Sequence, residues 1–216
     1  MIQHMAEPRR RVILVTDGDH IAQKVIEAVA KDLGGRCISL SAGNPTPLDG
    51  SQMVELIKMT PHDPVLVMFD DNGNYGRGKG EQAIEYLVKH PEIEVIGAIA
   101  VASNTRWVRG ATVKYSIDNH GRLVEEAVDK DGYADVDLEN RIYGDTVDVL
   151  NSFHIPNLIG IGDIGKMDGR DSLRKGSPIT KKAVQWILER SKANDRDHGE
   201  AASHLGESGG KQNLSQ

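Results

Sequence analysis

The sequence of 216 residues has a single cysteine, few aromatic residues and no long apolar run. Cys37 has no second cysteine to pair with, which excludes the small secreted domains that disulfides hold together. No apolar run approaches the roughly 18–20 residues that a membrane-spanning helix requires. Basic residues are outnumbered, with 26 Lys and Arg against 32 Asp and Glu. The resulting formal charge of −6 argues against a nucleic-acid-binding domain, and we expect no nucleic-acid partner.

The two ends of the chain differ in composition from the part between them. Residues 1–9 are mostly polar, and we expect them to form a flexible N-terminus. Residues 192–216 hold few apolar side chains among Gly, Ser, charged and amide residues. Such a segment buries too little apolar surface to offset the entropy of ordering it, which predicts a disordered C-terminal tail. The sequence therefore predicts one folded domain over residues 10–191, without internal repeats.

Short apolar runs alternate with amphipathic helical patterns along most of this domain. The runs predict buried strands at residues 12–15, 37–40, 65–69, 95–101 and 155–161. Helical spacing predicts helices between the strands, including one over residues 142–150 and a last one that Ser177-Pro178 begins as N-cap and first residue. This alternation predicts an α/β fold with a mostly parallel sheet covered by helices on both faces, of the Rossmann-like or flavodoxin-like type.

The pattern changes after the fourth predicted strand. Val113, Tyr115 and Ile117 alternate with polar residues, Asn119-His120-Gly121 is typical of a turn, and Leu123-Val124 continues the apolar pattern. Alternation on both sides of a glycine turn predicts an antiparallel β-hairpin inserted into the α/β series. We expect the hairpin to be a structural extension or a dimer contact, which leaves a homo-oligomer open.

Acidic side chains follow the first and the third predicted strands. Asp17 and Asp19 come directly after the first strand, and Asp70 and Asp71 come directly after the third. Ligands of parallel sheets bind at the carboxyl ends of the strands, so these carboxylates meet if the two strands are neighbours, as in the flavodoxin-like order. Oxygen ligands of this kind suit Mg²⁺ or Ca²⁺, and we expect a metal site here. The alternative is that the four residues cap a helix and form a turn.

A glycine-rich segment follows the third predicted strand and precedes a helix. Backbone N–H groups and the helix dipole can hold an anion at such a place, and two cationic side chains add to this. We therefore expect Gly76, Arg77, Gly78 and Lys79 to bind a ligand. The glycine spacing differs from that of the dinucleotide-binding fingerprint. The alternative is a flexible surface loop.

A second glycine-rich segment, residues 160–167, nearly matches a phosphate-binding P-loop. Met167 stands where a P-loop has the hydroxyl that binds magnesium, so we exclude ATP hydrolysis at this segment. We expect a loop at the carboxyl edge of the sheet, beside the acidic residues. The sequence has no evident nucleophile with its base, and Cys37 lies within an apolar strand, which favours a protein that is not an enzyme.

Four segments together resemble one protein family. They are residues 11–19, 69–74, 99–105 and 160–167, which read RVILVTDGD, FDDNGN, IAVASNT and GIGDIGKM. The combination resembles the soluble stage V sporulation protein AE of endospore-forming bacteria, over residues 10–191. The resemblance implies an accessory component of the SpoVA calcium–dipicolinate channel machinery that acts in spore germination. It also implies SpoVA membrane proteins as partners and a peripheral position at the outer face of the spore's inner membrane. It transfers no catalytic residue.

The layout of these side chains also resembles two kinds of metal-dependent site. Acidic residues after the first and third strands, Ser103 after the fourth and Lys166 after the fifth resemble a phosphate-receiver domain, in which Asp70 would accept the phosphate. The acidic pairs resemble a toprim-type site less closely, because no Glu follows the first strand before Glu27. The alternative function is therefore a Mg²⁺-dependent phosphoryl- or nucleotide-binding domain. A third alternative is that the acidic residues bind Ca²⁺ or calcium–dipicolinate directly.

Overall fold

The computed structural model describes residues 8–73, 77–105 and 108–207, with side chains described up to residue 194. Its main sheet has seven strands in the order β2-β3-β1-β4-β9-β6-β7. The strands are β1 (Arg10–Val15), β2 (Arg36–Cys37), β3 (Val65–Met68), β4 (Ile93–Val101), β6 (Ser116–Ile117), β7 (Leu123–Val124) and β9 (Leu158–Ile161). All neighbours pair in parallel except β6 and β7. The predicted α/β fold with a mostly parallel sheet is confirmed.

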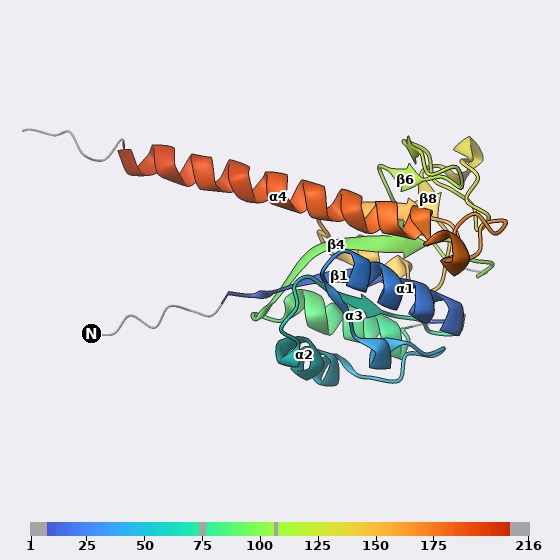
Figure 1. Cartoon of the computed structure of the whole chain (residues 1–216), viewed down its shortest axis with the longest axis horizontal. Coiled ribbons are helices and arrows are strands. Elements are labelled where there is room, and N and C mark those ends of the chain that lie inside the picture. The colour runs from blue at the N-terminus through green and yellow to red at the C-terminus, as the bar shows by residue number, and fades with distance from the viewer. Residues whose placement is uncertain (1–7, 74–76, 106–107, 208–216) are drawn as a thin grey trace, which may run out of the picture.

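Helices cover both faces of this sheet (Figure 1). The α-helices are α1 (His20–Asp32), α2 (Gly50–Met59), α3 (Lys79–Lys89) and α4 (Pro178–Glu207). Alternate residues of β1 explain the two layers, because Val12 and Leu14 pack in the core with α2 and α3, whereas Ile13 and Val15 pack in the core with α1 and α4. Burying one such side chain fully contributes about 1.5–3 kcal/mol. Because β1 is buried on both faces, all of its central residues have to be apolar.

The strand order differs from the flavodoxin-like order at one place. In the structure β3 lies between β2 and β1, whereas the flavodoxin-like order places β1 between the other two. The second strand is also shorter than the predicted 37–40, and a short 3₁₀-helix, η1 (Ser39–Ser41), follows it. The Ser41 hydroxyl accepts the Met68 N–H at 2.9 Å, so a side chain replaces a strand carbonyl there. Because β1 and β3 remain neighbours, the condition for the acidic residues to meet is fulfilled.

The predicted hairpin is confirmed, and it extends the main sheet. In β6 and β7, Ser116 pairs with Val124 and Ile117 pairs with Leu123, while β6 also pairs with β9. A separate two-stranded sheet joins β5 (Ala111–Thr112) to β8 (Arg141–Ile142). The remaining 3₁₀-helices are η2 (Val136–Leu138), η3 (Asp148–Ser152) and η4 (Leu173–Lys175).

The helix predicted over residues 142–150 is wrong. Ile142 belongs to β8 and pairs with Ala111, and Thr146 has a left-handed backbone with φ of 61° that no α-helix accommodates. Farther on, the Asp148 carboxylate accepts the N–H groups of Arg109 and Gly110 at 3.0 and 2.7 Å. Contacts with a distant segment therefore outweigh the local apolar spacing in this part of the chain.

Helix α4 is longer than the sequence predicts. It continues to Glu207, through the first part of the segment for which composition predicts disorder from residue 192. Residues 192–207 contain no proline and several good helix formers, so an established helix can propagate through them. Figure 1 shows α4 running along one side of the sheet and then projecting from the rest of the chain.

Candidate functional site

The carboxyl ends of β1, β3, β4 and β9 surround a pocket of about 300 Å³. The loops after these strands lie side by side because β1 pairs with β3 on one edge and with β4 on the other. Three of the four predicted carboxylates, those of Asp17, Asp19 and Asp70, line the pocket. Among the residues that the structure describes, the charged ones that line it are Asp17, Asp19, Asp70, Asp145, Asp163 and Lys166. We call it the acidic pocket.

Glycine at position 18 lets the loop after β1 approach the loop after β3. A side-chain carbon at Gly18 would lie 2.9 Å from the Gly43 carbonyl oxygen and 3.1 Å from Asp70 Cβ. Asp19 follows and begins α1, because its Oδ1 accepts the N–H groups of Ile21 and Ala22, both at 2.8 Å. This is the N-cap role that the sequence left as an alternative. The second oxygen of Asp19 remains directed into the acidic pocket.

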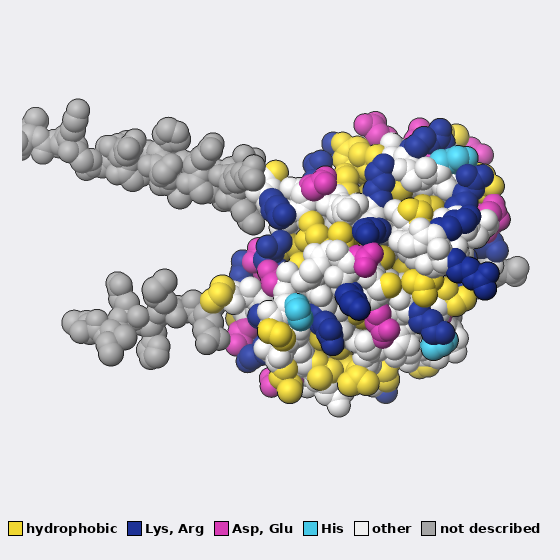
Figure 2. Space-filling view, in the orientation of Figure 1, with side chains coloured by type: hydrophobic (Ala, Val, Ile, Leu, Met, Phe, Trp, Pro, Cys, Tyr) yellow, Lys and Arg dark blue, Asp and Glu magenta, His cyan; other side chains and the backbone are white. Residues whose placement is uncertain are grey.

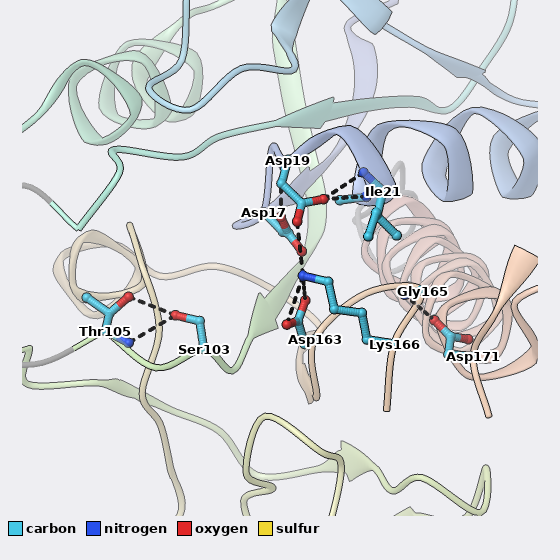
Figure 3. A network of polar contacts seen from close by, with 10 residues as sticks. Asp17, Asp19, Ile21, Ser103, Thr105, Asp163, Gly165, Lys166 and Asp171 are labelled. Atoms are coloured by element: carbon cyan, nitrogen blue, oxygen red, sulfur yellow. Dashed lines mark hydrogen bonds and ion pairs between the residues drawn. The ribbon is translucent and has the colours of Figure 1, made fainter. Parts of the chain in front are cut away.

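Lys166 supplies the positive charge of the acidic pocket (Figure 3). Its Nζ lies 3.0 Å from Asp19 Oδ2 and 3.0 Å from the Asp163 carboxylate. Asp19 belongs to the loop after β1, whereas Asp163 and Lys166 belong to the loop after β9. The ammonium group therefore joins two loops that are far apart in the sequence.

A fully buried carboxylate, that of Asp171, fixes the loop that carries Lys166. Asp171 Oδ2 accepts the Gly165 N–H at 3.0 Å and the Thr180 hydroxyl at 2.6 Å. Asp171 Oδ1 accepts the N–H groups of Ile179 and Thr180 at 2.9 and 3.0 Å. Asp171 thus supplies the capping oxygen at the start of α4. Pro178 begins the helix as predicted, but the predicted capping by Ser177 is wrong, because its hydroxyl has no partner among the described residues.

Burial makes two carboxyl groups of the acidic pocket retain their protons near neutral pH. Burial raises the pKa of Asp17 to about 8, and the negative charge of Asp19 adds to this increase. Burial also raises the pKa of Asp70 to about 7, and the nearby Asp145 carboxylate opposes its ionisation further. The pKa of Asp163 is raised by burial despite its contact with Lys166. A cation that entered the pocket would displace these protons.

The Asp19–Lys166 pair has the opposite behaviour. Burial disfavours the charge of Asp19, but the Ala22 N–H and the Lys166 ammonium outweigh it and lower the pKa of Asp19. Burial disfavours the charge of Lys166 as well, yet its hydrogen bonds with Asp163 and Asp19 raise its pKa. Both groups therefore stay ionised through the neutral range, and the ion pair persists at the edge of the acidic pocket.

Asp71 is directed away from the acidic pocket, unlike the other three predicted carboxylates. Its Oδ1 accepts the Gly80 N–H at 2.7 Å and its Oδ2 accepts the Glu81 N–H at 3.1 Å. These N–H groups belong to the first turn of α3, so Asp71 anchors the start of that helix. Gly78 leaves room for this, because a side-chain carbon there would overlap the Asp71 carboxylate. The structure does not place Asp71 with the other predicted metal ligands.

The predicted anion-binding segment also lies apart from the acidic pocket. Gly76 is outside the described residues, and Gly78 is the N-cap residue of α3. Arg77 and Lys79 are exposed. Arg77 lines a pocket of about 430 Å³ along α3, and Lys79 lines one of about 510 Å³ between α3 and the start of α2. The Asp71 carboxylate already accepts N–H groups at this helix start, so an external anion would have to displace it. The ligand site at these four residues therefore remains a prediction. Among the described residues, the N–H groups at the start of α3 are not free to bind an anion.

Two carboxylates of the acidic pocket were not predicted. Asp163 lies in the glycine-rich segment that the sequence already places beside the acidic residues, so a weak signal for it existed. Asp145 had no such signal, because the apolar spacing around it predicts a helix. The structure instead brings Asp145 to the loop after β3, where its carboxylate accepts the Gly73 N–H.

The donors of the acidic pocket are oxygen atoms, which is the ligand type that Mg²⁺ and Ca²⁺ prefer. Asp19 and Asp163 already contact Lys166. Asp17, Asp70 and Asp145 are the carboxylates of the pocket that have no ammonium partner among the described residues. In the part of the chain that the structure describes, no three Asp, Glu, His or Cys side chains are arranged to hold a metal ion. The oxygen donors thus fit a hard cation such as Mg²⁺ or Ca²⁺. The carboxylates would have to move closer together to coordinate it.

A parallel sheet with a polar pocket at its carboxyl edge defines the class of α/β domains that bind ligands there. The sequence model of the SpoVAE family, stage V sporulation protein AE1, matches residues 11–191. The chain therefore belongs to the SpoVAE family, which confirms the resemblance found in the sequence. No curated protein and no solved structure matches the chain.

Family membership gives the protein a sporulation-related role and places it in sporulating cells and spores. The matched range contains every charged residue of the acidic pocket, together with Asp171. Within the described residues, no helix combines the length and the apolar character that crossing a membrane demands.

Proposed function

We propose that this protein is an accessory component of the SpoVA calcium–dipicolinate channel machinery and acts in spore germination. The observation that carries the proposal is the family match over residues 11–191. In this role the protein has SpoVA membrane proteins as partners and lies at the outer face of the spore's inner membrane. Its task is binding and assembly rather than catalysis.

The acidic pocket is the part of the molecule that we connect with calcium. Asp17 and Asp70 come from neighbouring strands, and burial makes both retain protons that a divalent cation can replace. Calcium binding at this place would neutralise carboxylates that otherwise repel one another. The pocket opens at the carboxyl edge of the sheet, where a bound cation can keep free positions for a carboxylate-bearing ligand such as dipicolinate.

Three measurements test the proposal. The tagged protein is expected to co-purify with SpoVA membrane proteins from solubilised spore membranes, and a strain that lacks it is expected to germinate abnormally. In calorimetric titration with Ca²⁺, the double variant Asp17→Asn, Asp70→Asn is expected to lose the binding heat, because an amide cannot give up a proton to become the carboxylate ligand that the cation requires. Asp32→Asn is the matched control, since Asp32 is exposed on α1 and pairs with Lys181 outside the acidic pocket. Normal germination without any SpoVA partner would contradict the proposal.

A second candidate function is a Mg²⁺-dependent phosphoryl site. It is favoured by the presence of Ser103 and Lys166 in the same pocket as Asp70, which is the receiver layout. Against it, Lys166 is engaged by Asp19 and Asp163, and the Ser103 hydroxyl contacts the Thr105 hydroxyl at 2.7 Å (Figure 3). The toprim-type version has less support, because no glutamate is among the described residues that line the pocket.

Intact-mass measurement after incubation with acetyl phosphate and Mg²⁺ separates the two functions. An accessory protein without a phosphoryl site is expected to keep its mass. A gain of one phosphoryl group that Asp70→Asn abolishes would establish the second candidate instead. The same incubation without Mg²⁺ is the control for nonspecific acylation.

A further inference from the structure

A cluster of aromatic and basic side chains lies where α4 passes the hairpin, and none of its members lines the acidic pocket. The ring centroids of Tyr115 and Trp186 are 5.8 Å apart, with their planes inclined at 59°. Tyr115 directly precedes β6, and Trp186 lies on α4, two turns after the helix begins. Both side chains are half-buried, so part of each ring faces solvent.

Two cationic groups lie over these rings. The Arg190 guanidinium lies 4.9 Å from the Trp186 ring centroid and 5.8 Å from that of Tyr115. The Lys114 ammonium lies 5.2 Å from the Tyr115 ring centroid. We call these four residues the aromatic–basic patch. Stacking on aromatic faces restricts the two long side chains before any partner arrives.

The positive charge of the patch is not neutralised within the described part of the chain. The side chains of Lys114 and Arg190 make no ion pair and no hydrogen bond with a described residue; their recorded contacts are with the two aromatic rings. Glu189 precedes Arg190, but neighbouring residues of a helix do not face each other. Two restrained cations without a counter-ion, in a chain of net charge −6, point to an anionic partner.

The chemistry of Arg190 indicates which anion fits. Its N–H groups have no hydrogen-bond acceptor among the described residues, and a guanidinium binds a carboxylate through two parallel hydrogen bonds. Trp, Tyr and Arg are also the residues that contribute most to protein–protein binding. A small patch of this composition suits a short segment with carboxylate and apolar side chains.

An extended anionic bilayer fits less well. Lys and Arg are interspersed with Asp, Glu and apolar side chains over the face in Figure 2, so that view has no broad basic surface. A bilayer would also repel a chain of charge −6 over its whole contact area, whereas a peptide contacts only the patch. We propose that the aromatic–basic patch binds an acidic segment of a partner protein. This surface goes beyond the proposed function, which rests on the family and the acidic pocket.

Fluorescence of Trp186 tests the proposal directly. In the full chain with Trp107→Phe, Trp186 is the only tryptophan, because the sequence has two. A short synthetic peptide of alternating Glu and Leu is expected to change its emission in a saturable way, and the same peptide with Gln for Glu is expected to bind about tenfold more weakly. Arg190→Gln and Lys114→Gln are each expected to weaken binding of the Glu peptide by about tenfold.

Arg36→Gln is the matched control, because Arg36 is exposed on β2 at the opposite edge of the sheet, and a change of less than about twofold is expected. Equal binding of the Glu and Gln peptides, or equal losses from Arg190→Gln and Arg36→Gln, would overturn the proposal. So would tighter binding to phosphatidylglycerol vesicles than to the Glu peptide, since the patch would then recognise lipid. Circular dichroism of each variant distinguishes loss of binding from loss of folding.

Discussion

Asp17→Asn is expected to stabilise the protein at about pH 9 by several kcal/mol and to change its stability little at about pH 4. The cause is the burial of Asp17, which raises the pKa of this carboxyl group to about 8 in the folded chain. In the unfolded chain the same group has a pKa near 3.9. Between these two values the folded state holds a proton that the unfolded state has lost, so rising pH favours unfolding.

The size of the effect follows from the same linkage. One such group lowers the free energy of unfolding by about 1.4 kcal/mol per pH unit between the two pKa values. The full range corresponds to an upper bound on the order of 5 kcal/mol, which water entry into the pocket would reduce. Asp70, whose pKa burial raises to about 7, contributes in the same direction. Asn resembles the protonated carboxyl group and cannot ionise, so the substitution removes this loss of stability at high pH.

Urea unfolding of the wild-type chain and of Asp17→Asn across this pH range measures the difference. Asp32→Asn is the control, because Asp32 is exposed and its substitution removes the same formal charge. A constant difference between wild type and Asp17→Asn at all pH values would contradict the raised pKa. Added Ca²⁺ is expected to restore stability to the wild type at high pH, because a bound cation favours the ionised carboxylates.

Asp171→Ala is expected to lower the free energy of unfolding by about 3–5 kcal/mol. The variant leaves the N–H groups of Gly165, Ile179 and Thr180 without their acceptor, and the Thr180 hydroxyl without its partner. Asp171 is fully buried, so water does not readily replace the lost contacts. The start of α4 and the loop that carries Lys166 are expected to loosen together.

Urea unfolding measures the loss of stability, and hydrogen exchange of the Gly165 amide reports the loop itself. Asp171→Asn keeps one acceptor oxygen, so its free energy of unfolding is expected to fall less than that of Asp171→Ala. Asp32→Ala removes an exposed carboxylate that pairs with Lys181, and its cost is expected to stay below about 1 kcal/mol. An Asp171→Ala cost as small as that of Asp32→Ala would show that the buried contacts contribute little.

The central strands could be predicted because their environment requires a particular pattern. Alternate residues of β1, such as Leu14 and Val15, are buried in different layers, so the strand has to be apolar throughout. The meeting of Asp17 with Asp70 was predicted on the condition that their two strands are neighbours, and β1 and β3 fulfil it although the strand order differs from the flavodoxin-like one. The positions of side chains that depend on parallel strand pairing could therefore be predicted from the sequence.

The positions of side chains that depend on long-range contacts could not be predicted from the sequence. Asp71 directly follows Asp70, yet its side chain is directed to the start of α3, because its carboxylate accepts the N–H groups of Gly80 and Glu81. Asp145 reaches the acidic pocket from a segment in which β8 and a left-handed Thr146 replace the predicted helix. No local pattern distinguishes these cases, since each depends on which distant backbone group lacks a partner.

The shared carboxylate of Asp171 has a consequence for how the sequence can vary among relatives. One side chain satisfies donors on Gly165 and Thr180, which lie in different elements. A relative that replaces Asp171 needs a new acceptor for both elements at once. Positions 165, 171 and 180 are therefore expected to change together or not at all, and an alignment of the family should reveal them as one covarying unit.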